Sequence, residues 1–168
     1  MGQRKRDQKG FSLIELLIVV AIILVIAAIA IPNLLRARVS ANEASAVASL
    51  RTINSAMVTY NSNYPAVGFA PTLAALSGTV CAPPDQNNAC LIDTLLASGT
   101  KNGYNFNSSS IAVVVVPAVP ASQYLATGLP ISGSGRSFCS TEDGTVHYDP
   151  TGANIADHDS CLALTPLQ

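Results

Sequence analysis

The feature that most constrains this chain is an apolar run close to its N-terminus. Between residues 11 and 31 only Ser12 and Glu15 are polar. An α-helix rises about 1.5 Å per residue, so a helix over this run is about 31 Å long, close to the hydrocarbon thickness of a bilayer. The run therefore predicts a helix that crosses a membrane.

The carboxylate of Glu15 inside this run needs an explanation. A charge at the centre of a membrane helix raises the free energy of insertion by about 3 kcal/mol, and by less towards the helix ends. A buried charge either changes its protonation state or finds a partner of opposite charge. The alternative is that the Glu15 side chain simply reaches the cytoplasmic interface.

The residues before the run differ from an ordinary secretory signal, which has a shorter apolar core followed by a small-residue cleavage site. Here the small residue, Gly10, precedes the run, so a cut after it would leave the apolar helix on the mature protein. Four basic residues and one acidic residue give the first ten residues a net charge of +3. This predicts a cytoplasmic N-terminus and an exported head, although Arg36 and Arg38 beyond the run weaken the bias.

The segment KGFSLIELLIVVAIILVIAAIAIPNLLRAR, residues 9–38, resembles the class III signal and N-terminal helix of type IV prepilins and the related pseudopilins. The matching features are Gly10 at the cleavage point, Phe11 as the new N-terminus, Glu15 at the fifth mature position, the apolar run and Pro32. The resemblance covers about residues 5–65, and the head shares only local phrases with short major pilins.

The resemblance implies a fold and a processing pathway. The fold would be α+β, with one long N-terminal helix packed on a small antiparallel β-sheet head. A prepilin peptidase and methyltransferase would cut after Gly10 and methylate the Phe11 amine. Glu15 would then face the Phe11 amine of a neighbouring subunit in an apolar filament core, where an uncompensated charge is unfavourable.

Beyond the apolar run the helical pattern becomes amphipathic. Apolar residues recur at spacings of three and four over residues 46–64, which describes one helix face packed on the head. One helix is therefore expected over residues 11–62, ended by Pro65. Pro32 lacks an N–H group, so a kink or a locally melted turn is expected near residues 28–33.

The head is expected to hold two short helices and an antiparallel sheet of three to five strands. The helices are predicted within residues 71–78 and 91–99, each followed by a glycine. Strand formers occur at Tyr104, Phe106 and residues 111–116 after an Asn102-Gly103 turn, and residues 137–140 and 145–148 flank Asp143-Gly144 as a hairpin. The expected organisation is a leader at 1–10, a membrane or filament-core helix at 11–32, an amphipathic half-helix at 33–62 and a head at 63–168.

Four cysteines follow the apolar run, which in an exported head predicts two disulfides. A zinc site would need short paired spacings, which the sequence lacks. Pilins commonly close the C-terminal region with a disulfide, and this resemblance implies the pairs Cys81–Cys90 and Cys139–Cys161.

Other residues in the head invite chemical hypotheses. His147 and Asp149 would share one face of a strand, Asp157 and Asp159 have the spacing of part of a calcium loop, and Asn107 begins a glycosylation sequon. None of these patterns is complete enough to assign, so no catalytic residue, metal site or cofactor is predicted. The net charge of −1 gives no electrostatic case for nucleic-acid binding.

The leading functional hypothesis is a structural subunit, anchored in the inner membrane by one helix and then assembled with copies of itself into an extracellular type IV pilus. Its partners would be the processing peptidase, the pilus assembly machinery and the membrane. A pseudopilin of a type II secretion system is the alternative, and a monomeric membrane-anchored binding module is a third. The sequence does not indicate whether a filament would serve adhesion, motility, DNA uptake or electron transfer.

Overall fold

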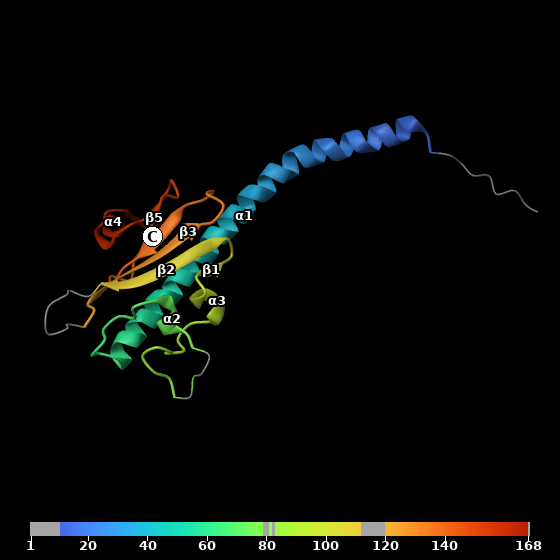
Figure 1. Ribbon diagram of the computed structural model, residues 1–168. Coiled ribbons are helices and arrows are strands. Elements are labelled where there is room, and N and C mark those ends of the chain that lie inside the picture. Colours follow the sequence, from blue (N-terminus) through green and yellow to red (C-terminus); the bar gives the residue numbers. More distant parts are fainter. Residues whose placement is uncertain (1–10, 79–80, 82, 112–119, 168) are drawn as a thin grey trace, which may run out of the picture. The chain divides into compact units, whose positions relative to one another are not determined.

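The computed structural model describes residues 11–78, 81, 83–111 and 120–167. The chain divides into two compact units, Met1–Arg38 and Val39–Gln168. Helix α1, Leu13–Asn63, belongs to both units, and every other element belongs to the second (Figure 1). The predicted leader with Gly10, and most of the apolar run at residues 111–116, lie outside the described residues.

Helix α1 confirms the expected single long helix, within two residues at either end. It ends two residues before Pro65, whose ring disfavours the α conformation in the residue that precedes it. The helix is continuous through Pro32, so no turn is melted near residues 28–33. A bend at Pro32 stays a prediction.

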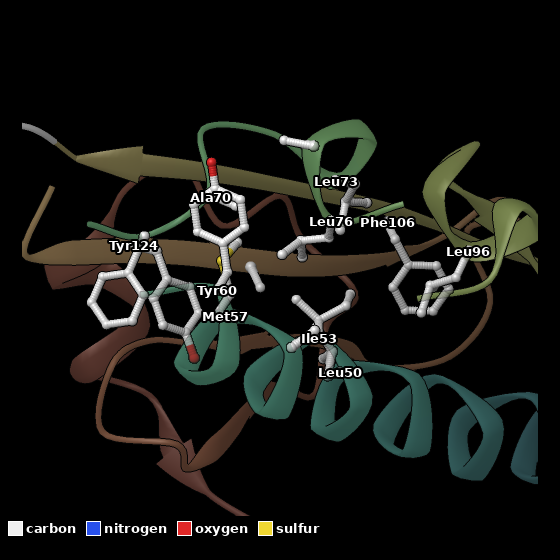
Figure 2. Close-up of a cluster of buried hydrophobic side chains, with 14 of the residues drawn as sticks. Leu50, Ile53, Met57, Tyr60, Ala70, Leu73, Leu76, Leu96, Phe106 and Tyr124 are labelled. Atoms are coloured by element: carbon white, nitrogen blue, oxygen red, sulfur yellow. The ribbon is translucent and has the colours of Figure 1, made fainter. Parts of the chain in front are cut away.

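The predicted amphipathic stripe is the face of α1 that packs in the core. Leu50, Ile53, Met57 and Tyr60 are almost completely buried, and the close-up of the core shows them beside side chains from the sheet and from the segment that follows α1 (Figure 2). Asn54, a polar residue beside this stripe, is buried as well, which the apolar periodicity does not predict. A polar side chain can be buried there because the sheet supplies hydrogen-bond partners for it.

Two short helices follow α1. Helix α2, Leu73–Leu76, is capped by the hydroxyl of Thr72, which accepts a hydrogen bond from the backbone of Ala75. Helix α3, Thr94–Ala97, is followed by Gly99 at φ +83°, the left-handed conformation favoured after a helix. The disulfide Cys81–Cys90 closes the loop between them.

The sheet is antiparallel throughout, which confirms the α+β expectation, but its six strands exceed the predicted three to five. Strands β1 and β6 are two residues each, too short to leave a periodic signal in the sequence. The strand order follows the chain order. The strands are β1 Thr100–Lys101, β2 Tyr104–Ile111, β3 Gln123–Pro130, β4 Ser137–Ser140, β5 Val146–Asp149 and β6 Thr165–Pro166.

Strand β3 was missed by the sequence analysis because both of its faces are covered. Tyr124 and Ala126 join the core beneath α1, whereas Leu125 on the opposite face joins a second cluster with the C-terminal tail. A strand buried on both faces loses the alternation of apolar and polar residues that predicts a strand. Gly128 faces Phe106 on β2, and a Cβ atom there would lie 3.1 Å from the Phe106 ring.

The C-terminal tail is the layer on that second face. Helix α4, His158–Leu162, brings Cys161 to Cys139 of β4, and both sulfur-bearing residues are fully buried. Ile155 and Leu164 complete the second cluster. The head therefore has three layers, with the sheet between the C-terminal half of α1 and the tail.

A buried polar network fastens α1 to the middle of the sheet. The side-chain amide of Asn54 donates to the Ser140 hydroxyl at 2.7 Å and to the Gly144 carbonyl at 3.1 Å. The Asn54 carbonyl accepts from the Tyr124 hydroxyl at 3.0 Å, and Ser140 in turn donates to the Thr145 carbonyl. Every member has partners, so the network fixes the position of the helix without leaving a buried polar group unsatisfied.

An ion pair holds the beginning of the second unit to the loop before β4. Glu43 of α1 accepts hydrogen bonds from the guanidinium of Arg136, the shortest at 2.8 Å, and from the Arg136 backbone. The guanidinium also lies over the rings of Phe138 and Tyr148. Burial opposes ionisation of Glu43, but its hydrogen bonds to Arg136 outweigh burial and lower the Glu43 pKa.

We expect Ser140→Ala and Ser108→Ala to change the free energy of unfolding differently, although each replaces a buried serine with alanine. Ser140→Ala leaves an Asn54 amide hydrogen and the Thr145 carbonyl unpaired, which should lower the free energy of unfolding by about 1–3 kcal/mol. The Ser108 hydroxyl is buried on β2 and has no hydrogen-bond partner among the described residues, so its removal should be neutral or stabilising. Urea denaturation of both variants checks this, and equal losses would contradict the network.

The second unit should fold without the apolar run. A fragment lacking residues 1–35 keeps the buried stripe of α1, the sheet and both disulfides. Expressed in an oxidising compartment, it should be a soluble monomer with no thiols that react under native conditions. A thiol assay and size-exclusion chromatography check both points, and two or more reactive thiols in the native fragment would contradict the disulfide pairing.

Candidate functional site

The beginning of α1 holds the residues for which the sequence predicts processing and assembly. Phe11 and Ser12 precede the first helical residue, and Phe11 is 79% exposed. The Ser12 backbone N–H donates to the Glu15 carboxylate at 2.9 Å. This is half of a capping box, in which the third residue of a helix pairs with the N–H of the residue before the helix.

The cap gives Glu15 a role within one chain that the sequence analysis missed. The Ser-x-x-Glu pattern at residues 12–15 is the signal that predicts it. A carboxylate in the first turn also interacts favourably with the helix dipole. Within the described residues Glu15 forms no ion pair, so any positive partner must come from the leader, another copy or another molecule.

The first unit exposes an unusually large apolar surface. Helix α1 is long and apolar enough to cross a membrane, and no residue of its most apolar 18-residue window is buried within the structure. The described large apolar side chains of this unit are about half exposed or more, and adjacent turns leave shallow apolar grooves between them. Isolated apolar side chains on a surface are ordinary, but a continuous surface of this kind marks contact with lipid or with another protein. The exposed residues include Leu13, Leu17, Val20, Leu24, Ile26, Ile29 and Ile31.

His147 and Asp149 lie two residues apart on β5 and so share a strand face, as predicted, but they form no hydrogen bond or ion pair with each other. The imidazole of His147 instead contacts the Leu164 carbonyl at 3.0 Å and the Asp143 carboxylate at 3.3 Å. Asp149 accepts hydrogen bonds from the backbone and the side chain of Thr151. The acidic partner of His147 is therefore Asp143 of the β4–β5 turn, because this turn folds back over β5.

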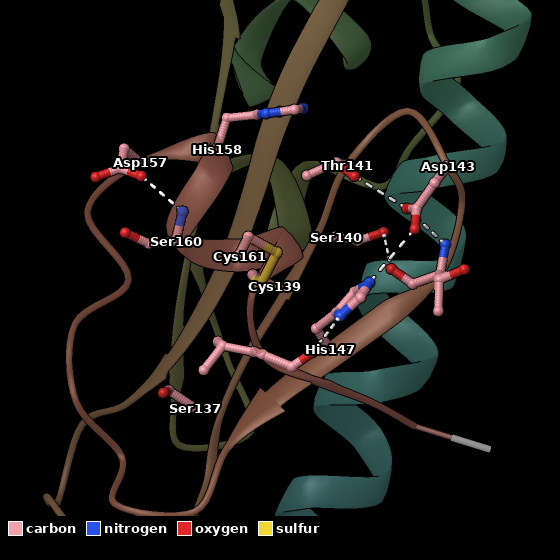
Figure 3. Close-up of a disulfide and its surroundings, with 12 residues drawn as sticks. Ser137, Cys139, Ser140, Thr141, Asp143, His147, Asp157, His158, Ser160 and Cys161 are labelled. Carbon is pink, nitrogen blue, oxygen red and sulfur yellow. Dashed lines mark hydrogen bonds and ion pairs between the residues drawn. A yellow bond between two sulfur atoms is a disulfide. The ribbon is translucent and has the colours of Figure 1, made fainter.

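Asp157 and Asp159, which have the spacing of part of a calcium loop, form other contacts in the structure. Asp157 caps α4 by accepting from the Ser160 backbone at 2.7 Å, as Figure 3 shows. Asp159 lies 3.2 Å from one ring nitrogen of His158, and Glu142 lies 2.9 Å from the other. Across the described residues no group of three or more His, Cys, Asp or Glu side chains is placed to hold a metal ion.

His158 ties the tail to the β4–β5 turn. Its imidazole is mostly buried, and both ring nitrogens face carboxylates, so the imidazolium form, which donates at both nitrogens, fits this position best. Burial acts to lower the His158 pKa, but the hydrogen bonds that the imidazolium donates to Glu142 and Asp159 outweigh burial and raise that pKa above 6.5. The contact between His158 and Glu142 thus joins the tail to the turn, and Asp159 binds the other nitrogen of the same imidazole.

Asn107, the first residue of the sequon, is exposed on β2. With Asn105 and Asn154 it lines a hollow of about 240 Å³ on the face of the sheet that carries the tail. No described contact indicates whether this asparagine is modified.

The tail should be held more strongly at acid pH. Protonated His158 is favoured in the folded head, so its contribution to stability is complete below its ordinary pKa near 6.5 and is lost as the pH rises through the raised folded value. An NMR titration of the two imidazoles should place the His158 midpoint above 6.5.

The Glu142→Gln variant keeps a hydrogen-bond acceptor but removes the charge, so it should lower the His158 midpoint. Asp149→Asn is the matched control, because Asp149 contacts Thr151 and should leave the midpoint unchanged. A wild-type midpoint at or below 6.5, or one that Glu142→Gln does not move, would contradict the assigned contact.

Comparison with known proteins finds a matching N-terminal motif and similarity to two curated proteins. Residues 5–31 match the prokaryotic N-terminal methylation motif. The chain is 60% identical over 45 residues to the type IV wide pilus major component PilA4 of Thermus thermophilus, a stretch covering 27% of this chain and 34% of that protein. It is 32% identical over 87 residues to the type II secretion system core protein G of Dickeya chrysanthemi, covering 50% and 56% of the two chains.

The chain thus aligns with about a third of one curated relative and just over half of the other. No solved structure matches it. The N-terminal motif is homologous to that of prepilins, and the alignment with the secretion protein, at half of this chain, is longer than the apolar run.

Proposed function

We propose that this chain, which carries the prepilin methylation motif and is homologous to a type IV pilin and a secretion pseudopilin, is a structural subunit of a type IV pilus. The observation that supports this most is the unburied apolar helix of the first unit, joined to a disulfide-closed head. Such a surface needs lipid before assembly and neighbouring helices afterwards.

The proposed life of the chain has two stages. The precursor lies in the inner membrane with a cytoplasmic N-terminus and an exported head, where both disulfides can form. A prepilin peptidase and methyltransferase removes residues 1–10 and methylates Phe11. The assembly machinery then extracts the helix into a filament of identical subunits, because head-to-tail contacts that do not close generate a filament.

In this proposal Glu15 has two successive roles. In the isolated subunit it caps α1, because one carboxylate oxygen accepts a hydrogen bond from the Ser12 N–H. In the filament it neutralises the Phe11 amine of a neighbour, since a methylated amine keeps its positive charge. The cap needs only a side-chain hydrogen-bond acceptor at the helix end, whereas the second role needs a formal negative charge.

The second candidate is a pseudopilin of a type II secretion system. The alignment with the secretion protein covers more of this chain than the alignment with the pilin. Imaging distinguishes the two, because long surface fibres that contain this protein support a pilus. Their absence in cells with an intact secretion operon supports the pseudopilin.

A catalytic function has little support in the described part of the head. The imidazoles of His147 and His158 are both held between hydrogen-bond acceptors, so neither faces a serine or thiol that it could activate. We accordingly assign no catalytic residue, metal or cofactor to the proposed subunit.

Processing should produce a mature chain that starts at Phe11. The intact mass of purified filaments should correspond to loss of residues 1–10 and gain of one methyl group. Replacing Gly10 with leucine should keep the precursor in the inner membrane, because a bulky side chain would occupy the cleavage point. A mature N-terminus after Ile31 would instead identify an ordinary signal peptide and overturn the filament proposal.

A series of Glu15 variants separates its two roles. Glu15→Gln keeps an acceptor for the Ser12 N–H but removes the charge, so it should assemble as poorly as Glu15→Ala if the charge pair matters. The uncompensated amine in the filament core would be unfavourable by about 3–5 kcal/mol, so fibres should be few or absent. Glu15→Asp should be intermediate, because it keeps the charge with a shorter reach.

Fibre counts must be read against the membrane pool of subunit, measured by immunoblot. The head fold and disulfides should be unchanged in every variant, since Glu15 contacts only the helix end in the structure. If Glu15→Gln makes normal numbers of fibres and Glu15→Ala does not, the cap is the important role. Normal fibres in both would leave Glu15 as an interfacial residue only.

A further inference from the structure

Two arginines lie at the end of the first unit where the apolar surface stops. Arg36 and Arg38 are exposed on α1, directly after the apolar Leu34 and Leu35. Neither forms an ion pair with any other described residue, in contrast to Arg136, which pairs with Glu43. Two such arginines at the edge of an apolar helix leave their guanidinium groups available to a negatively charged partner outside the chain.

Helix geometry places these side chains at a defined level of a membrane. If the run that ends at Ile31 spans the hydrocarbon core, Arg36 lies about 7.5 Å farther along the helix axis, at 1.5 Å per residue. Each headgroup layer of a bilayer is about 5–7 Å thick. Long arginine side chains extend readily towards this layer, so both guanidinium groups can reach lipid phosphates.

The directions of the two side chains favour lipid over a protein partner. Residues two apart on a helix differ by about 200° in direction, so Arg36 and Arg38 project from nearly opposite sides of α1. A neighbouring protein on one side of the helix would contact one of them. Lipid headgroups surround the helix and can contact both.

The charge of the head argues in the same direction. The second unit holds three basic and eight acidic residues, a net charge of −5, so it would be repelled by an anionic surface within about a Debye length of 10 Å. Arg36 and Arg38 are the basic groups that follow the apolar run most closely and can offset this repulsion. The acidic residues are Glu43, Asp85, Asp93, Glu142, Asp143, Asp149, Asp157 and Asp159.

We propose that Arg36 and Arg38 bind the phosphate groups of anionic phospholipids on the head side of the membrane and hold the unassembled subunit there. This inference rests on the proposed membrane stage and adds a ligand class to it. Guanidinium pairs with phosphate through parallel hydrogen bonds, which suits a planar group at a lipid surface. Removal of the subunit from the membrane would then require these contacts to break.

The test measures which lipids the full chain retains. Wild-type chain is purified in micelles that contain equal parts of phosphatidylglycerol and phosphatidylcholine, and native mass spectrometry counts the lipids that remain bound. Wild type should retain phosphatidylglycerol preferentially. Each single variant, Arg36→Gln or Arg38→Gln, should lower the preference about fivefold, the factor expected for a contribution of about 1 kcal/mol per basic residue.

Arg51→Gln is the matched control, because Arg51 is also an exposed arginine of α1 but lies four turns farther into the head unit. It should keep the wild-type preference, and the leader contributes equally to all variants. A double variant with unchanged preference would overturn the proposal, as would an equal loss in Arg51→Gln. A preference that depends on protein concentration instead of lipid charge would overturn it in favour of a second copy.

Flotation of the full chain with vesicles distinguishes this inference from the proposed function. A chain that does not float with vesicles lacks the membrane stage altogether, so both proposals fail. A chain that floats without any preference for phosphatidylglycerol keeps its membrane stage, and only the role of the arginines is overturned.

Discussion

Helix α1 must be stable in two different environments, and the rest of the structure depends on how it meets this constraint. Its first half exposes apolar side chains in every direction, and no described segment of the chain covers them, so they are available to lipid or neighbouring helices. Its second half buries one stripe from Ala46 to Tyr60 against the sheet. The change in pattern occurs around Val39, where the compact head unit begins.

The head uses directional contacts to hold this helix because apolar packing alone is not directional. Asn54 reaches the middle of the sheet, and Glu43 reaches the loop before β4. Burial raises the pKa of Tyr104 to about 12, and its hydroxyl donates to the Arg136 carbonyl beside this ion pair. Helix, sheet and loop are thereby joined at separate points along the second half of α1.

The Cys139–Cys161 disulfide strengthens the layer that the C-terminal tail adds to the sheet. A sheet covered on both faces requires a second layer, and the tail that provides it is short and has few apolar residues. A disulfide from Cys139 to Cys161 stabilises this layer by restricting the unfolded chain, and in the chain-entropy model a loop of this size contributes about 3 kcal/mol. The His158 contacts then set the position of α4 against the β4–β5 turn.

The sequence by itself determined the features that depend on local order: the length of α1, its change from uniformly apolar to amphipathic, the β4–β5 hairpin and the residues of the methylation motif. These follow from periodicity and turn chemistry, which are properties of neighbouring residues. Only the tertiary structure decided that Asn54 is buried, that His147 contacts Asp143 and that β3 lies between two layers. Each depends on contacts between segments far apart in the chain or across a folded turn, whose hydrogen-bond partners and covering layers exist only once the sheet has formed.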